Sequence, residues 1–327
     1  MTWRVAGAAR ATTGTRANQE DAFEIWPSEA QAAPQKGEAL LAVVADGMGG
    51  HAGGEVAGQL ACETFVAAFT EQDGPTKARL RMALDAGNSA IAARVAENAA
   101  LKGMGCTLVG AWIDEEGLHW VSVGDSLLIL FRAPEVLRLN ADHSLGAFLD
   151  EQARTNKISA AEAENNPYRN ALRSALTGKT IEILDLQADP YPLADGDWVI
   201  LASDGIATLE GDEIGDIVYA NREASPDRMA ELLIAAVEEK EAPDQDNTTV
   251  LVIKVTGDTA ADEQPTRILK AATALAPSSE DEGVATTQRI VLPPVYETLL
   301  RRHRTAALAV GMGLMFAIGW MLRALLG

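Results

Sequence analysis

The chain has 327 residues, a hydrophobic share of 47% and a formal net charge of −20. The length allows one large domain or two small ones, and the hydrophobic share is ordinary for a globular protein. The charge argues against a nucleic-acid partner, because the phosphate backbone would be repelled. The two cysteines, Cys62 and Cys106, are too few for a disulfide framework, so we expect a reducing compartment and two thiols in the core.

Residues 1–256 are predicted to form one domain of helices and strands. Short apolar runs predict buried strands at residues 40–45, 120–123, 127–131, 198–202 and 250–255. Apolar residues at steps of three and four predict helices over 54–71 and 76–99. Ser225-Pro226-Asp227 predicts the start of another helix, since it combines a capping serine with a proline in the first turn. The elements come in clusters, which favours an α+β fold of antiparallel sheets covered by helices.

The last part of the chain changes character. Residues 257–300 are acidic and rich in Pro, Ser, Thr and Ala, which predicts a flexible linker. Thr305–Leu322 is an uncharged run of 18 residues, near the lower limit for a bilayer-spanning helix, and three arginines precede it. By the positive-inside rule we expect a single-pass tail anchor over 305–323 in the inner (cytoplasmic) membrane, with domain 1–256 in the cytoplasm. A buried amphipathic or core helix is the alternative.

Acidic residues stand beside glycine, asparagine or another acid at several points, often directly after an apolar run. They occur in the segments Glu20-Asp21, Asp46-Gly47-Met48-Gly49-Gly50, Gly124-Asp125-Ser126, Ser203-Asp204-Gly205 and Asp246-Asn247-Thr248-Thr249. Such carboxylates are better explained as hard oxygen ligands at the rim of a sheet than as solubilising charge. Glycines after Asp46 let the backbone approach an ion closely. The sequence therefore predicts a metal-dependent phosphohydrolase, and no Cys/His cluster in it suggests zinc.

These motifs have neighbours that complete an ordered set: Arg16-Ala17-Asn18-Gln19-Glu20-Asp21-Ala22, Gly105-Cys106-Thr107 and Asp142-His143-Ser144-Leu145. The set resembles the metal-dependent protein serine/threonine phosphatases of type 2C, and bacterial members in particular, over residues 1–256. The resemblance implies an α-β-β-α sandwich of two antiparallel sheets flanked by helices. It also implies a centre of two Mn²⁺ or Mg²⁺ ions at one end, between the sheets.

The resemblance assigns a role to each residue of the centre. Asp46 would bridge the two metals, and the carbonyl of Gly47 would complete one metal's shell. Asp21 would hold a metal-bound water. Asp125, with Asp204, matches the ligands of the third metal of bacterial relatives. The remaining ligands, partly through waters, would be Glu20, Asp204 and Asp246.

Arg16 lies four positions before Glu20, where the family places the arginine that holds the substrate phosphate. An exposed surface arginine is the alternative for this residue. Several carboxylates within ~4 Å of each other repel by several kcal/mol, and two divalent cations remove that cost. A water that bridges two metals is acidic enough to act as hydroxide near neutral pH. We therefore expect direct hydrolysis of phosphoserine and phosphothreonine on cytoplasmic proteins, with a Ser/Thr kinase and its substrates as counterparts.

The chain departs from the family pattern around the expected flap, about 145–180. Met48 stands where some relatives have a histidine proposed as general acid, and Leu127 stands where arginine is frequent. Ser174 replaces another arginine, and Thr177 is inserted before Gly178. These changes bear on substrate handling more than on metal binding.

The sequence also suggests positions for two histidines and leaves two alternative functions open. His143 is expected to support the entry to the flap, and His119 to lie on the surface of a strand. The first alternative function is a catalytically silent or regulatory binding module at the membrane, which would lack some of the metal carboxylates. The second is a phosphatase for small phosphomonoesters, which kinetics on phosphopeptides and small esters would separate.

Overall fold

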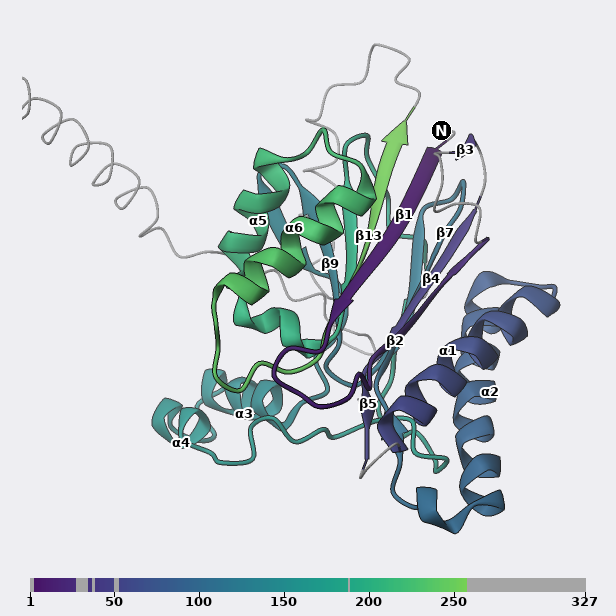
Figure 1. The fold of residues 1–327 in the computed structure, drawn as a ribbon, viewed down its shortest axis with the longest axis vertical. Helices are drawn as coiled ribbons and strands as arrows, with labels where there is room; N and C mark the ends of the chain where they lie inside the picture. Colours follow the sequence, from purple (N-terminus) through teal and green to yellow (C-terminus); the bar gives the residue numbers. More distant parts are fainter. Residues whose placement is uncertain (1–2, 28–34, 37–38, 50–52, 188, 258–327) are drawn as a thin grey trace, which may run out of the picture. The chain divides into compact units, whose positions relative to one another are not determined.

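Two antiparallel sheets pack face to face in this computed structural model, which describes residues 3–27, 35–36, 39–49, 53–187 and 189–257 (Figure 1). Sheet A has six strands in the described residues, in the order β10-β9-β12-β13-β1-β3. Its strands are β1 (Trp3–Thr12), β3 (Gln35–Lys36), β9 (Leu127–Arg132), β10 (Glu135–Arg138), β12 (Trp198–Ala202) and β13 (Thr248–Gly257). The central pair is long, because β1 and β13 stay in register over ten residues, from Trp3↔Gly257 to Thr12↔Thr248.

Sheet B has five strands in the described residues, in the order β11-β8-β7-β4-β2. Its strands are β2 (Ala22–Trp26), β4 (Leu40–Ala45), β7 (Leu108–Ile113), β8 (Leu118–Val123) and β11 (Asp185–Leu186). A two-stranded ladder, β5 (Gly47–Met48) with β6 (Gly105–Cys106), continues from the end of β4. The predicted strands at 40–45, 120–123, 127–131, 198–202 and 250–255 are all present.

Helices cover the outer face of each sheet, as Figure 1 shows. Sheet B carries α1 (Gly53–Glu71) and α2 (Thr76–Glu97), followed by the short 3₁₀ helix η2 (Ala99–Leu101). Sheet A carries α5 (Gly211–Ala220) and α6 (Pro226–Glu239). The first helix pair and the α6 start were predicted, and Ser225 does cap α6 by accepting a hydrogen bond from the Arg228 N–H.

Alternation along the strands divides the apolar side chains between layers. In β4, Leu40, Ala42 and Val44 join the core between the sheets, whereas Leu41 and Val43 join the core under α1 and α2. A third core lies between sheet A and helices α5 and α6. Because successive residues of a strand point to opposite faces, the continuously apolar run of β4 fits a strand buried on both sides. The expected α-β-β-α layering is confirmed.

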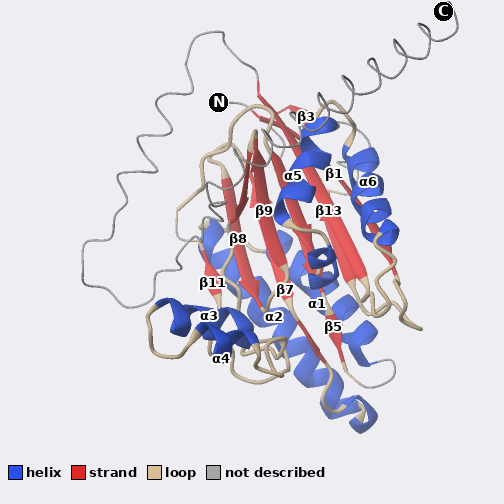
Figure 2. Cartoon of the chain, turned by 90° about the vertical axis from the view of Figure 1, so that its left-hand side faces the viewer, coloured by secondary structure: helices blue, strands red, loops and turns tan. Residues whose placement is uncertain are grey.

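Two short helices, α3 (Leu145–Arg154) and α4 (Ala160–Glu164), lie beyond the strand ends, at the same end of the sandwich as β5 (Figures 1 and 2). Ser144 caps α3 through the Ala147 N–H, and Ser159 forms a capping box with Glu162 at the start of α4. These helices occupy the region predicted as the flap.

The predicted linker and tail anchor lie outside the described residues. All described residues belong to one unit of the chain, residues 1–288, and a second unit, 289–327, lies outside them. Within the described ranges no helix has the length and apolarity to cross a membrane.

Candidate metal centre and active site

The predicted acidic residues meet because the registers align one end of several strands. Ala22 at the start of β2 pairs with Ala45 at the end of β4, which places Asp21 beside Asp46. In sheet A, Ala202 at the end of β12 pairs with Leu127 and with Val250. The loops that follow or precede these positions carry Asp125, Asp204 and Asp246. Antiparallel pairing thus gathers residues that are up to about 225 positions apart in sequence at one edge of the sandwich.

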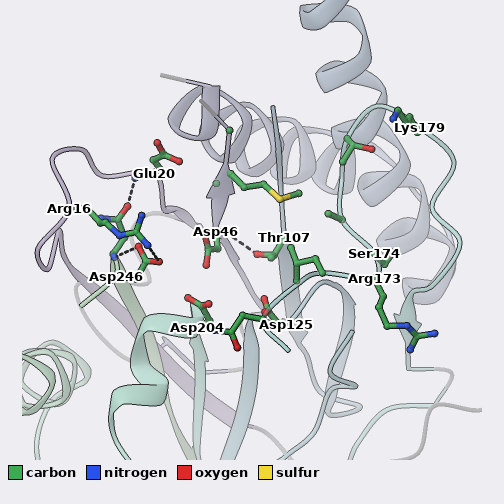
Figure 3. A pocket seen from close by; sticks show the side chains of 18 of the residues that line it. Arg16, Glu20, Asp46, Thr107, Asp125, Arg173, Ser174, Lys179, Asp204 and Asp246 are labelled. Carbon is green, nitrogen blue, oxygen red and sulfur yellow. Dashed lines mark hydrogen bonds and ion pairs between the residues drawn. The ribbon is translucent and has the colours of Figure 1, made fainter. Parts of the chain in front are cut away.

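Asp46 is the most strongly perturbed acid of this cluster. Its backbone N–H donates to Thr107 Oγ1 (3.0 Å), and the Thr107 N–H donates to the Asp46 carbonyl (2.9 Å). These bonds fix the backbone and leave the carboxylate directed into the cleft, with Asp204 and Asp125 across from it (Figure 3). Burial, followed by the negative charges of Asp21, Asp204 and Asp125, raises the pKa of Asp46 to about 10.

Asp21 lies behind this group and is held by a polar chain from sheet A. The Thr249 N–H donates to Ser203 Oγ (2.9 Å), and Ser203 Oγ donates to Asp21 Oδ2 (2.7 Å). The other oxygen, Asp21 Oδ1, is buried without a hydrogen-bond partner in the described part of the chain. Burial raises the pKa of Asp21 to about 6, against the lowering effect of the Ser203 hydrogen bond. One oxygen is therefore fixed and the other is left for a ligand.

Asp125 and Asp204 complete the group around Asp46. Burial, then the charges of Asp204 and Asp142, raises the pKa of Asp125 to about 7. Burial and the neighbouring Asp246 also raise the pKa of Asp204. Each of these carboxyls favours its neutral form mainly through burial and like charge, and a bound cation would reverse that preference.

Arg16, Glu20 and Asp246 form a second group next to Asp204. Arg16 Nη2 donates to Asp246 Oδ2 at 2.6 Å, and both side chains are about half exposed. Asn247 holds the Glu20 loop, since its Oδ1 accepts from the Glu20 N–H (2.8 Å). A Cβ on Gly54 would lie 2.1 Å from Glu20 Oε2, so the Glu20 carboxylate packs against the start of α1. Figure 3 shows it turned away from Asp46.

Gly47 sits where no larger residue fits. Its N–H donates to the Glu20 carbonyl (3.1 Å), and an added Cβ would lie 2.2 Å from the Gly54 carbonyl oxygen and 2.3 Å from that of Glu20. Any side chain would push apart the loop after β4, the loop before β2 and α1. The close approach of these three backbones is what the glycine-rich motif supports.

Apart from Asp21, these acids line a cleft of about 870 Å³ between the strand ends and the segment 170–182. Arg16 lies on one side of it, and Arg173 and Lys179 lie on the other, as Figure 3 shows. Met48 lines the cleft where some relatives have a histidine. His143, a histidine of the predicted motifs, instead accepts the Gly124 N–H at Nδ1 (3.1 Å), and burial lowers its pKa.

The residues present fit divalent metal ions. The donor set consists of carboxylate and backbone oxygens, which suits Mn²⁺ or Mg²⁺. The unpartnered, buried Asp21 Oδ1 and the like charges gathered round Asp46 are both explained by cations. The residues that would hold the ions are Asp21, Asp46, Gly47, Asp125, Asp204 and Asp246, with Glu20 at the rim.

The sequence did not assign a role to the residues that hold the acids in place. Thr107, Ser203 and Asn247 belong to the predicted motifs, but their contacts span 61, 182 and 227 positions. The one feature of the sequence that could have indicated this supporting role is that these residues lie in the predicted motifs. His119, expected on a strand surface, is buried with 4% of its surface exposed, so that expectation was wrong. His143 does support the flap entry, because its carbonyl accepts the Arg173 N–H (2.8 Å).

A family model described as protein phosphatase 2C matches residues 7–248. The serine/threonine protein phosphatase PstP of Mycobacterium tuberculosis H37Rv is 37% identical over 212 residues, which cover 63% of this chain and 37% of that relative. The serine/threonine phosphatase stp of Listeria monocytogenes is 31% identical over 222 residues, which cover 65% of this chain and 84% of the relative.

Solved structures give the same similarity. The crystal structure of M. tuberculosis PstP/Ppp has 32% identity and a TM-score of 0.64, covering 78% of this chain and 100% of that chain. The catalytic domain of PstP in complex with two manganese ions has 31% identity and a TM-score of 0.63, with the same coverage.

Proposed function

We propose that this chain, which belongs to the protein phosphatase 2C family, hydrolyses phosphoserine and phosphothreonine in proteins with two Mn²⁺ or Mg²⁺ ions as cofactors. The observation that carries the proposal is the convergence of Asp21, Asp46, Asp125 and Asp204, whose raised pKa values report one shared, buried acidic site. The manganese bound by the related PstP structure supports this choice of cofactor. A silent relative would be expected to lack some of these acids.

Within this proposal Asp46 would hold both ions, with further ligands from Gly47, Glu20, Asp204 and Asp246. Asp21 uses the oxygen that Ser203 leaves free, and Asp125 with Asp204 offers a third site. When bound, the ions supply an acidified water as the nucleophile and positive charge for the phosphoryl oxygens.

Arg16 is the phosphate-binding group of the proposal. Its ion pair with Asp246 uses one terminal nitrogen, so the rest of the guanidinium fork is free for two oxygens of a phosphate. The pair also holds Arg16 beside the acidic site, on the side of the cleft seen at the left of Figure 3. Met48 donates no proton, so the departing serine or threonine oxygen takes its proton from solvent in the open cleft.

The proposal places the enzyme at the cytoplasmic membrane, acting on the phosphoproteins of a Ser/Thr kinase. The sequence of Thr305–Leu322 with its upstream arginines supports the membrane location. The names of the relatives, which are serine/threonine phosphatases, support phosphoprotein substrates.

The test is phosphate release from a phosphothreonine peptide by the full chain, with Mn²⁺ and with chelator. We expect turnover in Mn²⁺, none in chelator and recovery on adding Mn²⁺ back. Asp204→Asn should reduce turnover to background, and Asp216→Asn, an exposed acid of α5, should leave it unchanged. Metal-independent turnover, or full activity of Asp204→Asn, would contradict the proposal. Activity on p-nitrophenyl phosphate without any on phosphopeptides would instead indicate a phosphatase of small esters.

A further inference from the structure

Two cations stand on the cleft wall across from Arg16. We propose that Arg173 and Lys179, which lie well apart on this wall, make it an anion subsite in which each can bind a carboxylate or second phosphate of the substrate, a few residues from the phosphoresidue. The inference rests on the proposed function and deepens it, because it names a substrate class: phosphoproteins whose target residue has acidic or phosphorylated neighbours. Figure 3 shows the two residues on the wall away from Arg16, with the acidic site between.

The lack of an ion pair sets Arg173 apart from most arginines in the described part of the chain. Arginines elsewhere are mostly neutralised, as in Arg138–Asp142 (2.8 Å) and Arg169–Asp150 (2.7 Å). Within the described residues, neither Arg173 nor Lys179 has an ion pair with an acid, and both are exposed. A cation that lines a cleft and keeps its charge unneutralised is available to a ligand.

The segment that carries both residues is held rigidly. The Thr177 and Gly178 N–H groups donate to Asn88 Oδ1 (3.1 and 2.8 Å), and Asn88 Nδ2 donates to the Lys179 carbonyl (2.6 Å). Ser174 Oγ donates to the Ile183 carbonyl (2.6 Å). The backbone of the subsite is thus fixed to α2 and to its own loop, so binding an anion requires no ordering of this backbone.

Arg173 is also oriented by a ring. Its guanidinium carbon lies 4.2 Å from the centroid of Phe148 on α3, a cation–π stack on the face of the ring. Its backbone N–H donates to the His143 carbonyl (2.8 Å). Stacking leaves the in-plane N–H donors of the guanidinium free, and these match the oxygens of a carboxylate or phosphate.

The two cations would offset the repulsion between an acidic substrate and the negatively charged protein. The chain carries a net charge of −20, and Glu182 also lines the cleft, so an acidic substrate segment is repelled overall. Local cations beside the reacting phosphate offset that repulsion where the segment must lie. Arg173 and Lys179 line the same cleft as the acids, and an extended peptide advances about 3.3 Å per residue, so the residues that can meet this wall are those a few positions from the phosphoresidue.

The experiment compares kcat/KM on phosphothreonine peptides that differ only in flanking residues: neutral, glutamate on either side, or a second phosphothreonine on either side. In the full chain we expect the acidic or doubly phosphorylated peptides of at least one side to be preferred over the neutral peptide. Arg173→Gln with Lys179→Gln should remove that preference, lowering kcat/KM on the preferred peptide by about five- to twentyfold, since an exposed ion pair contributes up to about fivefold. Comparison of the glutamate-flanked peptides with the doubly phosphorylated peptides shows whether a carboxylate or a phosphate is recognised.

The controls separate the subsite from general damage. Turnover of p-nitrophenyl phosphate and of the neutral peptide should stay within about twofold in the double variant. A matched Lys77→Gln, Lys102→Gln variant, which removes two exposed cations outside the cleft, should keep the preference. No preference in the active wild type, or equal loss on all substrates, overturns the subsite. An inactive wild type would instead overturn the proposed phosphatase function.

Discussion

Asp46→Asn should make the metal-free protein more stable while abolishing catalysis. In the folded state burial and three neighbouring acids raise the pKa of Asp46 from an ordinary 3.8 to about 10. At about 1.4 kcal/mol per pKa unit, the distance from the ordinary value to pH 7 corresponds to roughly 4 kcal/mol of destabilisation. Removing one of the four acids relieves only part of their mutual repulsion, and burying the asparagine side chain also costs free energy. We therefore expect the free energy of unfolding of the metal-free variant to be higher by about 2 kcal/mol.

The same pKa fixes the direction of the pH dependence. Between 3.8 and about 10 the folded state holds a proton on Asp46 that the unfolded chain has lost. The stability of the metal-free wild type therefore falls as pH rises through this window. From about pH 7 to about pH 8.5, above the raised pKa of Asp21 and at or above that of Asp125, Asp46 dominates this slope.

Thermal unfolding in chelator measures both effects. A gain of about 2 kcal/mol corresponds to a Tm about 4–8 °C higher for Asp46→Asn in a domain of this size. The difference should widen with pH, and Asp216→Asn should unfold like the wild type. Added Mn²⁺ should raise the Tm of the wild type and not that of Asp46→Asn. A variant that is less stable than the wild type in chelator, or a wild-type Tm that does not fall over this pH range, would refute the reasoning.

Three further predictions concern other parts of the chain. Arg16→Ala should mainly raise KM for phosphopeptides in steady-state kinetics, and an unchanged KM with a lower kcat would speak against a phosphate-binding role. Arg132→Gln should destabilise the fold by about 3 kcal/mol in urea with turnover intact, because it leaves the buried Asp197 without its bidentate partner; an unchanged urea midpoint would refute this. Removing residues 301–327 should move the protein from the membrane pellet to the soluble fraction with activity retained, and a truncated protein that still sediments with membranes would contradict the tail anchor.

The apolar strands β4, β8, β9, β12 and β13 were predicted from the sequence, whereas β7 and β1 were not. The run at 40–45 is apolar throughout and coincides with β4. By contrast, β1 (Trp3–Thr12) has four alanines and one glycine among its ten residues, and both residue types have low strand propensity. It forms because β13 pairs with it over its whole length, a contact between the two ends of the domain. Local propensity carries no record of such a partner.

The acids of the site could be predicted because each lies in a short motif, but their support could not. Ser203 and Asp21 meet through a hydrogen bond across 182 positions, and Asn247 holds the Glu20 loop across 227. The orientation of Glu20 toward Gly54, and the Arg16–Asp246 pair, also depend on tertiary packing. The metal roles of these residues stay predictions that follow from the resemblance.

Anomalous diffraction at the manganese edge, from crystals grown in Mn²⁺, tests the metal centre most directly. The proposed phosphatase requires two strong peaks within bonding distance of Asp46, with Asp204 and Asp246 in their shells. Peaks elsewhere, or no peak beside Asp46 at saturating Mn²⁺, would contradict it.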